Sequence, residues 1–263
     1  MLVLIRGAGD IATGIALRLY RTGIQVVMTD LPAPTAIRRT VCFSPAITDG
    51  ETVVEDVRAV RADSPAQALS LLAQGAVPVL PDPECLCREQ LHPDALVDAI
   101  LAKRNLGTRI TDAPVVVGIG PGFTAGEDCH AVVETMRGHT LGRVIYRGSA
   151  LPNTNIPGLI GGYAGERVLR APADGIFTRI LDIGDEVQPG DIAGTVNGQP
   201  MKCTIGGVVR GILTSGTPVH LGMKSGDVDP RCQPEYCTTA SDKALAVGGG
   251  ALEAILHLTG ALR

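Results

Sequence analysis

Two glycine-rich turns carry the residue types in this sequence that could do chemistry. The first turn, residues 7–10, follows an apolar run at 2–5 and precedes a pattern with apolar residues every three or four positions. Glycines let backbone amides approach a pyrophosphate, and the first amides of a helix attract anions. A second apolar run ends at Asp30, where an acid can bond ribose hydroxyls. The expected nucleotide-binding residues are Gly7, Ala8, Gly9, Asp10, Ile11, Ala12 and Asp30.

Two alternatives stay open at this first turn. The glycines can equally serve packing, with no ligand bound. If a dinucleotide binds, Asp30 favours the free ribose hydroxyl of NAD, whereas Arg38 and Arg39 would suit the 2′-phosphate of NADP. The paired arginines can also be a solvated pair on a helix surface.

The second turn, residues 118–126, contains Gly120 and Gly122 and leads from an apolar run into a dense set of polar residues. His130 with Asp128 or Glu134 could act as a general base, and Cys129 could be a nucleophile if a cation lowers its pKa. The alternative is that these groups bond the backbone of their own turn. The candidate catalytic residues are His130, Glu134, Arg137, His139 and Cys129.

No cysteine or histidine spacing in the chain indicates a metal site. Cys85 and Cys87 are separated by one residue and have no second pair nearby, so we expect this pair to have no function. Lys202 lies beyond the turn expected at residues 197–200, on the returning strand, which argues against covalent attachment of a cofactor.

Composition narrows the function classes. A net charge of −4 and a pI near 5.7 argue against nucleic-acid binding. No apolar run reaches the roughly 18 residues that a membrane span needs. We therefore expect a soluble, cytoplasmic protein whose seven cysteines are reduced.

The pattern along the chain predicts an α/β fold in three parts. Residues 1–160 predict a Rossmann-like doubly wound sheet, and residues 161–230 predict a small all-β domain of the biotinyl/lipoyl-like barrel-sandwich type. Turn and strand phrases at 170–177 and 183–191 are typical of that domain. Residues 231–263 predict a helix, capped by Ser241, that packs back on the first domain. Its run of three glycines, residues 248–250, predicts a close backbone contact.

Several segments together resemble the YqeB family, whose members are associated with the selenium-dependent molybdenum hydroxylase system. The matching segments are residues 7–14, 35–41, 120–145, 170–177 and 241–256. The first domain also resembles the Rossmann domain of XdhC/CoxI-type accessory proteins. The resemblance implies a factor that matures a molybdenum hydroxylase, with that enzyme as partner, and homo-oligomers are conceivable. It supplies no catalytic residues.

The expected ligand is NAD(P) or a molybdopterin dinucleotide, since both contain the diphosphate that the first turn would bind. Two other functions fit the same residues. One is an NAD(P)-dependent oxidoreductase that acts on a small molecule, and the other is a non-catalytic chaperone that transfers a cofactor. Nicotinamide turnover would distinguish the oxidoreductase from the chaperone.

Overall fold

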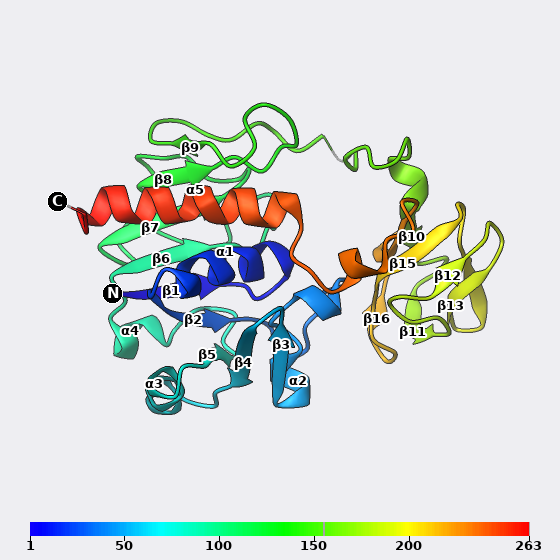
Figure 1. Ribbon diagram of the computed structural model, residues 1–263, viewed down its shortest axis with the longest axis horizontal. Helices are drawn as coiled ribbons and strands as arrows, with labels where there is room; N and C mark the ends of the chain where they lie inside the picture. The colour runs from blue at the N-terminus through cyan, green and yellow to red at the C-terminus, as the bar shows by residue number, and fades with distance from the viewer. Residues whose placement is uncertain (155, 263) are drawn as a thin grey trace. The chain divides into compact units, whose positions relative to one another are not determined.

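The computed structural model describes residues 1–154 and 156–262, which form two compact units (Figure 1). The first unit combines Met1–Pro34, Cys42–Thr154 and Ala240–Arg263, and the second combines Thr35–Val41 with Asn155–Thr239. The chain therefore leaves the first unit and returns to it twice. No described helix is long and apolar enough to cross a membrane.

A nine-stranded mixed sheet forms the centre of the first unit, in the order β3-β4-β5-β2-β1-β6-β7-β8-β9. Strands β4 to β8 run parallel, and the edge strands β3 and β9 are antiparallel to their neighbours. We call the edge at which the parallel strands end the carboxyl edge. The strands are β1 (Leu2–Arg6), β2 (Gln25–Thr29), β3 (Glu51–Val54), β4 (Val57–Arg61), β5 (Val77–Leu80), β6 (Ala95–Asp98), β7 (Val115–Ile119), β8 (Ala131–Val133) and β9 (Val144–Ile145).

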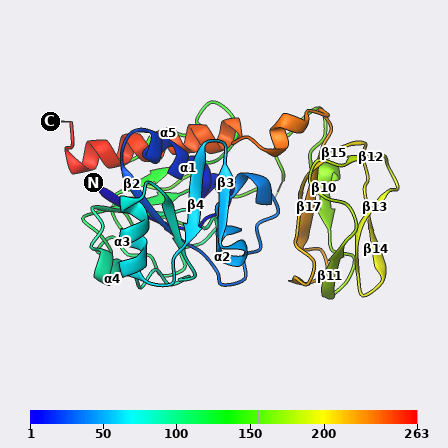
Figure 2. The same cartoon turned by 60° about the horizontal axis from the view of Figure 1, so that its bottom comes forward.

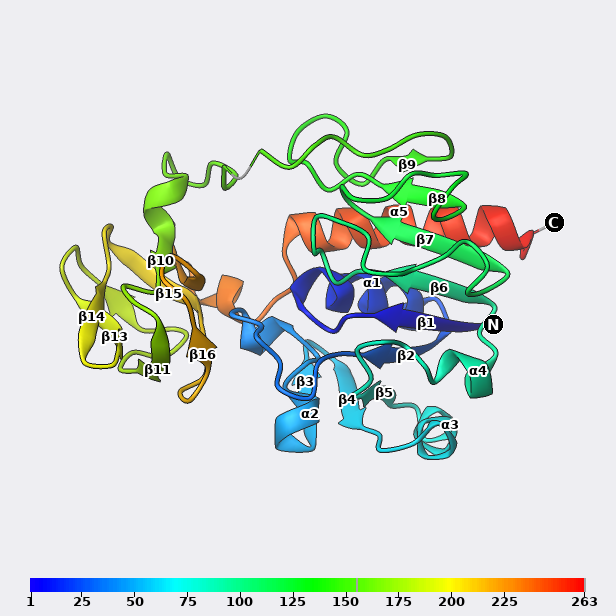
Figure 3. The same cartoon turned by 180° about the vertical axis from the view of Figure 1, so that it is seen from behind.

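Helices cover the two faces of this sheet unequally. The long helices α1 (Asp10–Arg21) and α5 (Asp242–Thr259) lie over one face (Figure 2). The other face carries α3 (Pro65–Ala73), the short α4 (Arg88–Leu91) and loops (Figure 3). A one-turn helix, α2 (Ala46–Asp49), precedes β3. Side chains in register on four strands form the apolar layer of this second face, namely Leu4, Val27, Leu96 and Val116.

The expected fold class, a Rossmann-like doubly wound sheet with a biotinyl/lipoyl-like domain, is wrong. In a doubly wound sheet, helices connect the successive parallel strands. Here residues 99–114 join β6 to β7 and residues 120–130 join β7 to β8, and neither connection contains a helix. Both edge strands are antiparallel, so the unit is a mixed α/β structure.

The two long helices of the first unit touch through their backbones. A methyl group added to Gly14 would lie 2.6 Å from Ala244 Cβ, and one added to Gly248 would lie 2.7 Å from the Gly14 carbonyl oxygen. Because Gly14 meets Ala244 and Arg18 meets Gly248, the helices run in the same direction. The predicted backbone contact of the glycine run is confirmed. So is the predicted cap, because Ser241 Oγ accepts a hydrogen bond from the Ala244 amide.

The second unit consists of two four-stranded antiparallel sheets, β10-β17-β15-β12 and β14-β13-β11-β16. The phrases that suggested a barrel-sandwich repeat are divided between these two sheets, and bulges shift the register of several pairs. The strands are β10 (Val168–Arg170), β11 (Gly175–Arg179), β12 (Glu186–Val187), β13 (Ile192–Val196), β14 (Gln199–Lys202), β15 (Gly207–Ile212), β16 (Pro218–Val219) and β17 (Lys224–Asp229). Three 3₁₀ turns accompany them, η1 (Arg39–Val41), η2 (Gly165–Arg167) and η3 (Pro234–Cys237).

Buried ion pairs join the strands of the second unit. The Arg210 guanidinium donates to Asp227 Oδ2 at 2.7 Å and to Asp229 Oδ2 at 3.0 Å, and Arg167 also pairs with Asp227. Lys202 ends β14 and is exposed, on the returning strand of the hairpin, as the sequence predicted.

We predict opposite effects for two neighbouring glycines of α5. Gly248→Ala should destabilise the protein by about 1–3 kcal/mol, because the new methyl group overlaps the α1 backbone. Gly249→Ala should stabilise it by up to about 1 kcal/mol, since a methyl group there meets nothing within 4 Å and alanine favours the helix. Urea denaturation of both variants measures the difference. Equal stabilities would contradict the helix contact.

Candidate functional site

The first glycine turn lies at the carboxyl edge and is held in place by its neighbours. Gly7 adopts a φ of +103°, and a methyl group there would come within 3.1 Å of the Ala99 backbone. Asp30 Oδ2 accepts a hydrogen bond from the Ala8 amide at 3.0 Å, and Asp30 Oδ1 accepts one from the Leu31 amide at 2.7 Å. Burial raises the pKa of Asp30, and the two amide donors oppose this shift. The acid therefore ties the end of β2 to the turn.

Open space lies in front of Gly9, which caps the amino end of α1. A methyl group on Gly9 would meet no atom within 4 Å, and the residue has an extended backbone. The next amides are partly satisfied by the chain itself, because Asp10 Oδ1 accepts a hydrogen bond from the Ile11 amide at 2.9 Å. Ala12 is fully buried on the side toward the core. An approaching anion thus meets the turn at Gly9.

Cationic side chains gather beside this turn. Lys103 follows β6, and Lys243 stands in the first turn of α5. Desolvation by surrounding protein atoms lowers the pKa of both lysines, and Asp10 attracts both of them. Repulsion from Lys103 and from Arg137 lowers the pKa of Lys243 further. The carboxyl edge therefore holds ammonium groups whose charge is not fully compensated.

The polar residues predicted from the second turn divide between different places. Glu134 is 2% exposed at the end of β8, and its carboxylate accepts hydrogen bonds from the Met136 and Leu151 amides. Arg137 forms a bidentate ion pair with Asp242 at 2.6 and 2.9 Å. His139 is exposed on the following loop. Glu134 and Arg137 therefore lie near Lys243, where they shape the charge of the edge.

His130 and Cys129 stand before β8, at the opposite edge of the sheet from the glycine turn. His130 Nδ1 accepts a hydrogen bond from the Val116 amide at 3.0 Å, so this nitrogen supports the backbone of β7. Cys129 is fully buried, and burial raises its pKa to about 11. A thiol with this pKa is protonated at neutral pH and is a poor nucleophile.

The remaining predicted residues serve the chain's own packing. Gly120 and Gly122 adopt φ values of +78° and +112°, and a methyl group on Gly122 would lie 2.6 Å from the Arg104 backbone. In the second unit, Arg38 donates to the Tyr236 carbonyl, and Arg39 donates to the Ile212 carbonyl and to Asp182.

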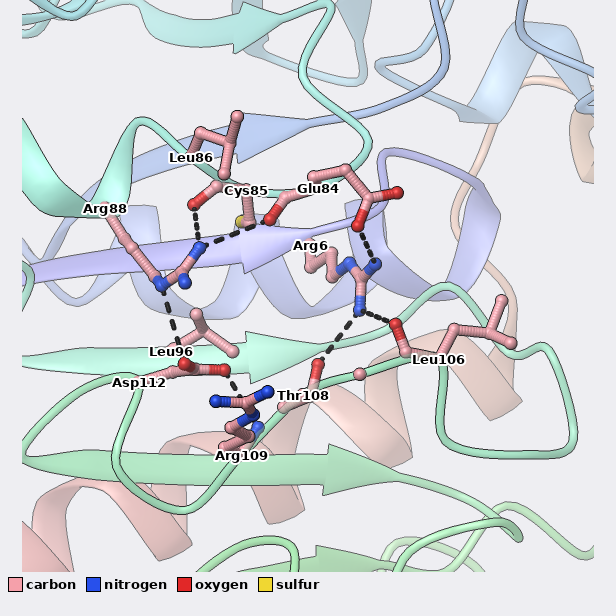
Figure 4. Close-up of a pocket in the computed structure, with 11 residues that line it drawn as sticks. Arg6, Glu84, Cys85, Leu86, Arg88, Leu96, Leu106, Thr108, Arg109 and Asp112 are labelled. Carbon is pink, nitrogen blue, oxygen red and sulfur yellow. Dashed lines mark hydrogen bonds and ion pairs between the residues drawn. The ribbon is translucent and has the colours of Figure 1, made fainter.

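A polar cavity of about 270 Å³ lies on the sheet face opposite α1, and Figure 4 shows the side chains around it. Arg6, at the end of β1, donates to Asp98 Oδ2 at 3.3 Å and to Thr108 Oγ1 at 3.0 Å. Arg88 pairs with Asp112 at 3.5 Å. The residues that line it are Arg6, Glu84, Cys85, Leu86, Arg88, Leu96, Leu106, Gly107, Thr108, Arg109 and Asp112.

The sequence places Lys103 at the carboxyl end of an expected strand, where ligands bind in such sheets, but it gave no sign of this cavity or of Lys243 beside the turn. Arg6 directly follows an apolar run and gives no separate signal. Lys243 is far along the sequence from the turn that it approaches in the structure. Among the described residues, no group of three or more His, Cys, Asp or Glu side chains is arranged to hold a metal ion.

Comparison with known proteins gives a clear relative. The chain is 52% identical over 257 residues to the uncharacterized protein YqeB of Escherichia coli (strain K12), across 98% of this chain and 48% of that protein. The chain thus spans about half the length of this relative. The homologue supports the similarity to the YqeB family that the sequence segments indicated. No family model matches the chain.

Solved structures give only distant similarities. An aspartoacylase family protein from Mesorhizobium loti has a TM-score of 0.26 and 13% identity, covering 78% of this chain and 84% of its own. A succinylglutamate desuccinylase from Silicibacter sp. TM1040 has a TM-score of 0.25 and 12% identity, covering 86% and 84%. Similarities this low say nothing about what the chain binds.

We predict that the Arg6–Asp98 pair is essential to stability. Asp98→Asn should cost about 3–5 kcal/mol, because it leaves the buried guanidinium without its counter-charge. Glu84→Gln is the matched control, since Glu84 lies 3.9 Å from Arg6 with a side chain that is 71% exposed, and it should cost less than about 1 kcal/mol. Chemical denaturation of both variants tests this. Similar decreases in the free energy of unfolding of the two variants would contradict the prediction, because the buried pair would then contribute no more than the exposed one.

Proposed function

We propose that this chain, a homologue of YqeB over about half of that protein's length, binds the diphosphate of a nucleotide-containing ligand at residues 7–12. The observation that carries the proposal is the open space at Gly9 with Lys103 and Lys243 crowded beside it. Backbone amides at the start of α1 would donate to the diphosphate, and the helix dipole favours the anion there.

The two lysines supply the charge that such a ligand needs. Holding desolvated ammonium groups close together is unfavourable in the unliganded protein, as their lowered pKa values indicate. A bound diphosphate would neutralise the two ammonium groups and remove this unfavourable repulsion. The arrangement is typical of a binding site that is retained at the expense of stability.

Asp30 would contact the sugar of the ligand. Its oxygens already accept two backbone amides, but an ionised carboxylate has about four acceptor positions and can also accept a ribose hydroxyl. The ligand class is NAD(P) or a molybdopterin dinucleotide, because both contain a diphosphate. Arg38 and Arg39 already form hydrogen bonds within the second unit. We therefore assign neither arginine as a partner of a 2′-phosphate.

A maturation role for a selenium-dependent molybdenum hydroxylase in the cytoplasm fits this site, with the chain holding a cofactor and passing it on. The support for this role is the similarity to the YqeB family. The geometry favours a non-catalytic carrier over an oxidoreductase, because Glu134 is occupied by amides and His130 stands at the far edge of the sheet. A carrier would bind the hydroxylase and leave the nicotinamide unreacted.

We predict that Gly9→Ala weakens ligand binding without unfolding the protein. The added methyl group meets no protein atom but occupies the space that the diphosphate requires, so Kd should rise at least about tenfold. Isothermal titration calorimetry with NADH, NADPH, ADP and pyrophosphate measures this. Gly249→Ala, on the exposed side of α5 where a methyl group also has room and φ is not positive, serves as a control for the glycine change. Unchanged affinity in Gly9→Ala would contradict the site.

We also predict that affinity for ADP falls as the pH rises from 7 to 10. The two lysines have pKa values below their ordinary 10.5, so they lose the charge that attracts the diphosphate earlier than an exposed lysine does. Lys243→Met should weaken this pH dependence and raise the Tm of the unliganded protein at neutral pH, because a desolvated charge is removed. A lower Tm with unchanged affinity would show that Lys243 has a structural role only.

A further inference from the structure

Cys85 and Cys87, which the sequence gave no function, form a pair of thiols beside the polar cavity. Cys85 lines the cavity, and Cys87 lies two residues on, before α4. Each thiol shifts the pKa of the other, and both side chains are buried. This site is on the opposite face of the sheet from α1, so it is separate from the glycine turn.

The surroundings of Cys85 favour its thiolate. The neighbouring Cys87 thiol lowers the pKa of Cys85, as do Thr29 Oγ1, which lies 3.5 Å from Cys85 Sγ, and the positive charge of Arg6. Burial and the charge of Asp82 oppose this shift, and the pKa of Cys87 is raised well above its usual range by Cys85, burial and Asp82. Of the two sulfur atoms, Cys85 Sγ both borders the cavity and has the more favoured thiolate, so it is the candidate nucleophile.

The burial of Cys85 limits which oxidant can reach its sulfur, which borders a cavity of about 270 Å³. Cys85 is only 2% exposed, so an approaching molecule must be small. Hydrogen peroxide is close to water in size and can accept a hydrogen bond from the Arg6 guanidinium, which faces the same space (Figure 4).

We infer that Cys85 and Cys87 form a peroxide-reactive dithiol site. The Cys85 thiolate attacks one oxygen of hydrogen peroxide, the O–O bond breaks, and hydroxide leaves with a sulfenic acid on Cys85. The Cys87 sulfur then attacks the Cys85 sulfur, its proton leaves with the hydroxyl group as water, and a Cys85–Cys87 disulfide forms. The two thiols are oxidised by two electrons, and the peroxide is reduced to two water molecules once the hydroxide takes up the proton that Cys85 had lost.

The sequence makes the product easy to detect. Trypsin cleaves after Arg61 and Arg88 with no site between them, so one peptide, residues 62–88, carries both cysteines. The reduced full-length protein is treated with one equivalent of hydrogen peroxide, alkylated and digested. We expect peptide 62–88 to lose the mass of two hydrogens and to resist alkylation, before Cys232 on the exposed surface is oxidised.

Two variants separate the steps. Cys87→Ser should stop the reaction at the sulfenic acid, which dimedone traps on Cys85, whereas Cys85→Ser should leave residue 87 reduced. Arg6→Lys keeps a cation and should slow the oxidation, with folding checked by circular dichroism. Oxidation of Cys232 while peptide 62–88 stays reduced would overturn the proposal. So would faster reaction with the bulkier cystamine than with peroxide at equal concentration.

Discussion

The backbone contact between α1 and α5 is the constraint on which the first unit depends. Gly14 and Gly248 bring the helices so close that no side chain fits between them, and the helices run in the same direction. Their amino ends consequently lie at the same edge of the sheet. This arrangement brings Lys243, from the last segment of the chain, beside Asp10 and Lys103. The closeness of Lys243 to Lys103 and Asp10 is thus a result of helix packing.

Residues that follow β1 and β2 and the last residues within these strands have different surroundings. Beyond β1 and β2, the glycine turn and Asp30 face an open space suited to an anion. The last residues of the same strands, Arg6 and Thr29, point to the face opposite α1, where they meet Asp98 and Cys85. A buried ion pair is costly unless its partners are well bonded, and here Arg6 and Asp98 share Thr108 as a further partner. The first residues after β1 and β2 form the proposed binding turn, and the last residues within these strands form a buried polar layer.

Local features of this protein could be predicted from sequence, and long-range ones could not. The helix cap at Ser241 and the backbone contact of residues 248–250 were predicted correctly, because each depends on nearby residue types. The fold class was wrong because hydrophobic periodicity does not show that the connections after β6 and β7 lack helices. The place of Lys243 beside the turn and the environment of Cys85 were missed because their partners come from distant strands and helices. The glycine turn was identified, and its ligand stays a prediction.

An NMR titration with pyrophosphate tests the central claim most directly. Amide signals of a ¹⁵N-labelled protein would be followed as the ligand is added at neutral pH. The account predicts shifts concentrated at residues 8–12, with smaller ones near Lys103 and Lys243, and saturation at one ligand per chain. Shifts confined to other surfaces, or no saturable shift at the start of α1, would contradict it.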